Sequence, residues 1–113
     1  MIYFVQHGTE GNIKIGWSKD VDRRIGDFRR QWPPPGPVLL VSCGGSHADE
    51  QMLHAALSQT EHHISGEWYH ASIKEFALSM LGERRLYSKH IAKHFPSVQI
   101  YQTLEQLDQS EPW

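Results

Sequence analysis

The fold of this chain is decided by residues 2–17, which read IYFVQHGTEGNIKIGW. Two short apolar runs, Ile2 to Val5 and Ile13 to Trp17, flank the segment Gly8-Thr9-Glu10-Gly11-Asn12. Glycine and asparagine between apolar runs are typical of a tight turn, so this stretch predicts a β-hairpin.

The two strands of this hairpin are expected to carry polar groups on one face. Side chains alternate along a strand, so the apolar residues of each strand share the other face. These residues are Ile2, Phe4, Ile13 and Ile15. If both apolar sets face one core, Tyr3 and Lys14 emerge together on the opposite face. Gly16 lies there too and lets a substrate or another backbone approach closely, unless it is simply a glycine tolerated near a strand end.

A helix is expected directly after the hairpin, because apolar residues recur at the spacing of one helix face. They are Val21, Ile25, Phe28 and Trp32. Ser18 is the expected N-cap, and Asp20 suits the first turn. Arg24 borders the apolar stripe, so its planar guanidinium could reach the rim of the sheet and bind a phosphate. The alternative is an ion pair with Asp20, four residues earlier.

The next elements are a stiff connection, a third strand and a second helix. Four prolines in residues 33–37 end the first helix, and the apolar run Val38 to Val41 favours a central strand buried on both faces. Ser46 and Asp49 predict a capping box, followed by a core stripe of Leu53, Ala56 and Leu57. Glu50 shares the inner flank of this helix, where a carboxylate is unusual unless it is paired or binds a cation. His54 lies one turn further on and could share a metal or a hydrogen bond with it.

The last part of the chain predicts further helices. Residues 66–70 resemble a short strand, with Trp68 expected in the core, and Ser72 with Glu75 predicts another capping box. The stripe of this third helix is Ile73, Phe76, Ala77, Met80 and Leu81. Further along, Tyr87, Ile91 and Phe95 could line a fourth helix that Pro96 ends, before an extended piece at Val98 and Ile100 and an amphipathic turn from Thr103. We expect a domain over residues 1–82 and an appendage over 83–113, helical in part and frayed at its end.

Composition describes an ordinary globular chain of 113 residues with a formal net charge of -2. The single cysteine makes no internal disulfide, and no apolar run has membrane-spanning length, so a cytoplasmic protein without membrane contact is expected. Residues 14–30 hold six Lys or Arg, which form either a local basic surface or a solvated helix face. The histidines clustered in residues 47–70 give only weak support for a zinc site, since paired ligand spacing is missing.

Five motifs in order resemble the GIY-YIG nuclease superfamily over residues 1 to about 72. They are Tyr3; Lys14-Ile15-Gly16; Arg24; Glu50 with Leu53, His54 and Leu57; and Gly66-Glu67-Trp68-Tyr69. The Lys-Ile-Gly form of the second motif is similar to a phage and bacterial branch. The resemblance implies an α+β fold in which a small antiparallel three-stranded sheet, the hairpin plus a central strand, is flanked by helices.

The resemblance also implies a divalent-metal-dependent endonuclease that cleaves DNA. Glu50 would hold one Mg²⁺ or Mn²⁺, Arg24 would stabilise charge on the phosphorane, and Tyr3 would orient or deprotonate the attacking water. Lys14 would lower the pKa of Tyr3 or contact the phosphate. The expected substrate-binding residues are Gly16, Lys19, Arg23 and His54.

Three departures from the superfamily pattern favour an alternative function. Lys14 replaces a tyrosine, Phe28 replaces a histidine of some relatives, and the asparagine expected beyond the glutamate is absent. That span offers His62, His63 and Glu67 instead, and Glu67 could orient Arg24 or a histidine, or be solvated. The alternative is a catalytically inactive nucleic-acid-binding module. A weaker one is a protein-interaction domain that uses the loop from Trp32 to Pro37.

Overall fold

The computed structural model describes residues 1–83, 88–96 and 98. Within them, five strands form one antiparallel sheet in the order β3-β1-β2-β5-β4. The strands are β1 (Ile2–His7), β2 (Ile13–Trp17), β3 (Pro37–Cys43), β4 (His63–Ser65) and β5 (Trp68–Tyr69). The helices are α1 (Val21–Gln31), α2 (His47–Leu57), α3 (Lys74–Ser79) and α4 (Ser88–His94), with a 3₁₀ turn, η1 (Ala71–Ile73), before α3. The expected α+β class is confirmed.

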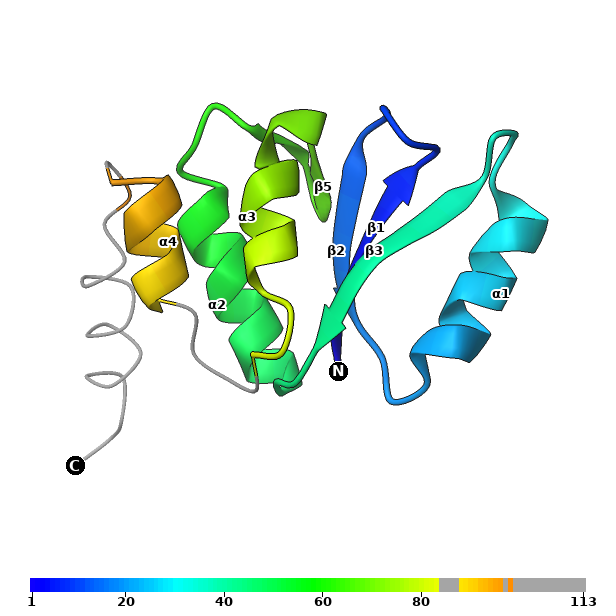
Figure 1. Ribbon diagram of the computed structural model, residues 1–113, viewed down its shortest axis with the longest axis horizontal. Coiled ribbons are helices and arrows are strands. Elements are labelled where there is room, and N and C mark those ends of the chain that lie inside the picture. Colours follow the sequence, from blue (N-terminus) through cyan, green and yellow to red (C-terminus); the bar gives the residue numbers. More distant parts are fainter. Residues whose placement is uncertain (84–87, 97, 99–113) are drawn as a thin grey trace.

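The hairpin has the register that strand alternation predicts. Tyr3 pairs with Gly16 and Val5 pairs with Lys14 across β1 and β2. Tyr3 therefore shares a sheet face with Lys14, and α1 covers this face (Figure 1). A slip of one residue would have separated the two side chains.

Two apolar cores lie on opposite faces of the sheet. The smaller core packs α1 on β1 and consists of Tyr3, Val5, Val21, Ile25 and Phe28. The larger core lies between the other face and α2, α3 and α4, which Figure 1 shows together on that side. It includes Ile2, Phe4, Ile13, Ile15, Leu53, Leu57, Phe76 and Met80. Ile91 and Phe95 from the α4 region also pack into this larger core.

The sheet differs from the expected one in size and in strand order. The prediction of a three-stranded sheet leaves out β4 and β5. β5 falls within residues 66–70, which the sequence predicts to resemble a strand but does not place in the sheet, and β4 has only three residues, too short a pattern to stand out. The prediction that the run from Val38 to Val41 is a central strand is wrong, because β3 is an edge strand. The N-terminal half of β3 is partly exposed to solvent, since Val38 is 36% and Leu39 is 39% exposed.

Several local predictions also need correction. Asp20, not Ser18, caps α1, and its carboxylate accepts a hydrogen bond from the backbone N–H of Arg23 at 3.1 Å. No capping box begins the third helix, because Ser72 lies in η1. Leu81 is 76% exposed instead of buried, and Trp68 is half-buried beside Trp32 instead of in the core.

The C-terminal region is described only in part. The expected fourth helix is α4, which ends two residues before Pro96. The predictions for Tyr87, Ile100, the amphipathic turn from Thr103 and the frayed end lie outside the described residues. Among the described helices, none has the length and apolar character needed to cross a lipid bilayer.

Candidate functional site

The candidate site lies beside β2, at the point where its pairing with β5 ends. β5 pairs with β2 only at Ile13 and Lys14. Beyond this point the backbone N–H of Ile15 donates to the carbonyl of Glu67 at 3.0 Å, and the carbonyl of Ile15 lies 3.2 Å from His54 Nε2. The His54 side chain of α2 thus takes the position that a backbone group of a neighbouring strand would occupy, and it holds α2 against the sheet edge.

Gly16 provides the space through which Tyr3 reaches this edge. A Cβ atom placed on Gly16 would lie 2.2 Å from the Tyr3 hydroxyl oxygen and 2.3 Å from Cζ. The phenol therefore lies directly over the glycine of the neighbouring strand. Gly16 is required because an aromatic side chain of the chain itself approaches it, not a second backbone.

Tyr3 and Arg24 meet on the α1 face of the sheet. Tyr3 is 1% exposed, and this burial raises the pKa of its hydroxyl. A hydrogen bond and the positive charge from Arg24 oppose the rise in the pKa, whereas the charges of Glu67 and Glu50 add to it. No ion pair joins Arg24 to Asp20 within the described residues, so the structural alternative for Arg24 does not hold here.

Glu50 is the buried acid of the site. It lies in the first turn of α2, which begins with the expected capping box of Ser46 and Asp49. Its side chain is 5% exposed, and the nearest basic atoms are Nε2 of His47 at 3.4 Å and Nε2 of His54 at 4.0 Å. Burial, followed by the negative charge of Glu67, raises the pKa of Glu50.

His54 holds α2 against the sheet. Its Nδ1 lies 2.6 Å from the Tyr69 hydroxyl, and the two rings stack at 5.7 Å. Burial lowers the pKa of His54 and raises that of Tyr69, so both are neutral at pH 7. The carbonyl of Ile15 only accepts, so we assign the proton of His54 to Nε2 and let the Tyr69 hydroxyl donate to Nδ1.

Glu67 has a different partner from those that the sequence suggested, and it was not among the expected catalytic, substrate-binding or metal residues. Its Oε1 atom lies 2.7 Å from Nζ of Lys14, so Glu67 pairs with Lys14 and not with Arg24. A sequence signal was present, since Glu67 lies within the closing motif next to Trp68. The partner was not predictable, because the pair spans 53 residues.

Glu50, His54 and Glu67 have the chemistry of a cation site. One ligand atom from each of them lies within 4.8 Å of the others. Two carboxylates suit a hard divalent ion such as Mg²⁺ or Mn²⁺. The two hydrogen bonds of His54 favour a positioning role for its imidazole, so the carboxylates are the better ligands.

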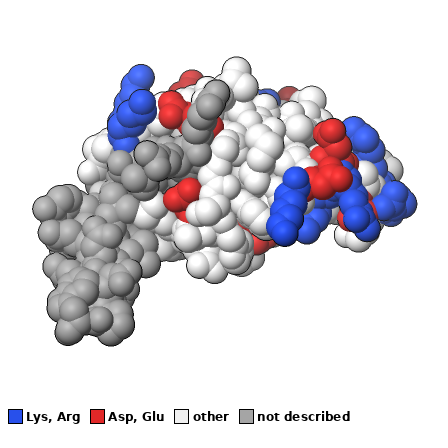
Figure 2. Space-filling model, turned by 90° about the horizontal axis from the view of Figure 1, so that it is seen from below, with Lys and Arg blue, Asp and Glu red and all other residues white. Residues whose placement is uncertain are grey.

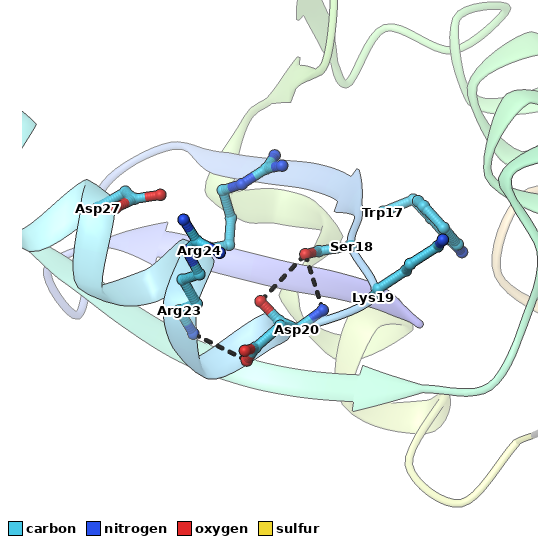
Figure 3. Close-up of a pocket in the computed structure, with 7 residues that line it drawn as sticks. All are labelled: Trp17, Ser18, Lys19, Asp20, Arg23, Arg24 and Asp27. Carbon is cyan, nitrogen blue, oxygen red and sulfur yellow. Dashed lines mark hydrogen bonds between the residues drawn. The ribbon is translucent and has the colours of Figure 1, made fainter.

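Lys19, Arg23 and Arg24 line a cavity of about 440 Å³ between the end of β2 and the start of α1. Its other lining residues are Trp17, Ser18, Asp20 and Asp27. In Figure 3 the arginines come from α1, and Ser18 and Lys19 come from the segment that joins β2 to α1. Figure 2 shows Lys and Arg side chains interleaved with acidic ones at the α1 end of the molecule. The local surface is thus mixed in charge, with three cations around one hollow.

The structure therefore brings most of the expected site residues to one edge of the sheet. Six of them contact, or interact electrostatically with, another member of the group. These are Tyr3, Lys14, Gly16, Arg24, Glu50 and His54. Lys19 and Arg23 lie in the adjoining cavity, which Arg24 also lines.

Comparison with known proteins matches this chain to a family model. Searches of curated protein sequences and of solved structures return no match. The family model described as the T5orf172 domain matches residues 1–81, which include β1 to β5, α1 to α3 and every candidate site residue. The chain therefore belongs to the T5orf172 domain family.

Proposed function

We propose that this protein is a divalent-metal-dependent endonuclease of the GIY-YIG type that hydrolyses phosphodiester bonds in DNA. One observation carries the proposal. A buried acid, Glu50, lies within range of the charge of Lys14 and of the phenol of Tyr3, and Tyr3 in turn interacts with the guanidinium of Arg24. Membership of a phage-associated, nuclease-like domain family supports the same function.

Glu50 would hold Mg²⁺ or Mn²⁺, which supplies a Lewis acid that polarises the phosphate. Arg24 would place fixed positive charge where negative charge develops on the phosphorane. It is suited to this role because Arg24 lines the open cavity and its side chain also interacts with Tyr3. Lys19 and Arg23 would hold the flanking phosphates of the strand in the same cavity.

Tyr3 would orient the attacking water instead of deprotonating it. Its pKa is raised by burial, so its hydroxyl keeps its proton at neutral pH. Lys14 is not among the groups that lower this pKa, contrary to one expectation from the sequence, and its ammonium is paired with Glu67. A neutral hydroxyl held by Arg24 is a hydrogen-bonding group of fixed direction.

The second candidate function is a nucleic-acid-binding module without turnover. The specific observation in its favour is that Lys14 is neutralised by Glu67 while Tyr3 stays a neutral phenol. Neither group is then poised to accept a proton from water. The cavity with Lys19, Arg23 and Arg24 would still bind a phosphate backbone.

Nicking of supercoiled plasmid DNA with Mg²⁺ or Mn²⁺ separates the two functions. We expect wild type to nick the plasmid, and Glu50→Ala and Arg24→Ala to lose activity by at least about 100-fold, as removal of a charge-stabilising group does. Arg29→Ala is the matched control for Arg24, because Arg29 is exposed on the same helix outside the cavity. It should retain activity.

Equal nicking by all four preparations would trace the activity to a contaminant and overturn the proposed nuclease. An inactive wild type that shifts DNA with a steep salt dependence would instead establish the binding module.

A further inference from the structure

Glu67 is anchored beside the buried acid by its backbone. Its carbonyl accepts a hydrogen bond from Ile15 at 3.0 Å, at the point where the pairing of β2 with β5 ends. Its side chain, which is 42% exposed, extends from this anchor toward Lys14. The backbone position of Glu67 is therefore defined by the sheet, while its carboxylate is partly exposed and contacts Lys14.

Glu50 faces the same space without a strong partner of its own. Its carboxylate is 5% exposed, and no hydrogen bond to it is found within the described residues. The two imidazoles beside it lie at 3.4 and 4.0 Å, and His54 is occupied by Ile15 and Tyr69. A buried carboxylate in this condition is stabilised by a cation.

Lys14 is the cation that Glu67 now contacts. The ammonium lies 2.7 Å from Glu67 Oε1 and 5.7 Å from the centre of the Trp68 ring. The Lys14 side chain is only 19% exposed. A divalent ion shared by both carboxylates would compete with Lys14 for Glu67, since the carboxylate oxygens of Glu50 and Glu67 lie within 4.8 Å.

We propose that Glu67 is a second carboxylate ligand of the divalent ion, and that it exchanges Lys14 for that ion. The exchange releases the ammonium of Lys14 on the sheet face that also carries Tyr3, where it binds a phosphate of the substrate. Metal binding thus prepares the phosphate site. The inference rests on the proposed function, because it requires a divalent ion at Glu50.

Mn²⁺ binding to the full chain, measured by electron paramagnetic resonance without DNA, tests the ligand. We expect Glu50→Gln to abolish binding and Glu67→Gln to weaken it at least about tenfold, because even groups that only support a ligand have effects of this size. Glu61→Gln is the matched control, since Glu61 is an exposed acid outside the cluster. It should bind Mn²⁺ as wild type does.

A double-mutant cycle tests the exchange. Lys14→Met should tighten Mn²⁺ binding when Glu67 is present and have no effect in the Glu67→Gln background, because the competition requires Glu67. The release of Lys14 is tested with Ca²⁺, which allows DNA binding to be measured with little cleavage. Lys14→Met should weaken binding of a short duplex several-fold with Ca²⁺ and leave it unchanged in EDTA.

The outcomes distinguish the two proposals. If wild type binds Mn²⁺, Glu50→Gln does not, and Glu67→Gln behaves like Glu61→Gln, the second ligand is overturned while the proposed nuclease stands. Equal tightening by Lys14→Met in both backgrounds would overturn the exchange and reduce the role of Lys14 to general charge repulsion. If wild type binds no Mn²⁺ at millimolar concentration, both proposals are overturned.

Discussion

At the scale of single residues, the site depends on which side chain is absent as much as on which are present. Gly16 leaves the space for the Tyr3 hydroxyl, and Tyr3 in turn interacts with Arg24. Glu50 is held in a buried position that raises its pKa. Gly16 and the buried Glu50 each lower the stability of the fold, since glycine weakens a strand and burial of a carboxylate is energetically unfavourable.

The Gly16→Ala variant should displace the phenol, because the new Cβ would lie 2.2 Å from its oxygen. We expect a loss of nicking of at least about tenfold and a destabilisation of about 1–3 kcal/mol, typical of overpacking. Plasmid nicking and urea unfolding measure the two effects. Gly26→Ala in α1 is the control, since nothing lies within 4 Å of its added Cβ. A Gly16→Ala protein with wild-type activity would show that the Tyr3 hydroxyl is dispensable.

The Glu50→Gln variant should be more stable than wild type at pH 7 in EDTA. Because folding raises the pKa of Glu50, the folded state holds its proton more tightly, and wild-type stability falls as the pH rises from the ordinary value of 4.5 through the folded pKa. Glutamine has no such penalty. Thermal unfolding should therefore show a gain in Tm at pH 7 that shrinks toward zero below pH 4.5. A gain that does not depend on pH would contradict this origin.

At the scale of elements, the site is positioned by the ends of short structures. β5 is so short that it leaves the edge of β2 open, and His54 of α2 binds the free carbonyl there. The capping box of α2 fixes the first turn, from which Glu50 extends. The carbonyl of Ile15, which would otherwise be unpaired at this edge, is thereby satisfied by the helix that carries the acid.

The Ser46→Ala variant should fray this first turn, because Ser46 Oγ accepts a hydrogen bond from the N–H of Asp49 at 3.1 Å. We expect a loss of about 1 kcal/mol in the free energy of unfolding and weaker Mn²⁺ binding through the looser Glu50. Ser58→Ala at the other end of α2 is the control, with a change in stability of no more than about 0.5 kcal/mol. Unchanged Mn²⁺ affinity in Ser46→Ala would show that the cap does not position Glu50 for metal binding.

At the scale of the whole molecule, the candidate site joins two cores. Tyr3 belongs to the core under α1, whereas Leu53 and Tyr69 belong to the core under α2, α3 and α4. Arg24 therefore approaches from one layer and Glu50 from the other (Figure 1). The geometry of the site requires both layers to stay packed on the sheet.

The Ile91→Ala variant tests whether α4 belongs to this cooperative structure. Ile91 is 3% exposed and packs in the larger core, so truncation should lower the free energy of unfolding by about 2–5 kcal/mol. Lys93→Ala on the exposed face of α4 is the control. Urea unfolding followed by tryptophan fluorescence should keep a single transition. An unchanged midpoint would show that α4 is not needed for the stability of the sheet domain.

The sequence by itself determined the hairpin and its register, the apolar stripe of α1, the capping box of α2 and the inward position of Glu50. Each of these depends on periodicity or turn chemistry within a dozen residues, and such patterns are visible in the chain. Only the tertiary structure decided that β3 lies at an edge, that Lys14 pairs with Glu67 and that the pKa of Tyr3 rises. These features depend on which distant segments come into contact and on how completely the contacts exclude water. Local sequence patterns predict neither.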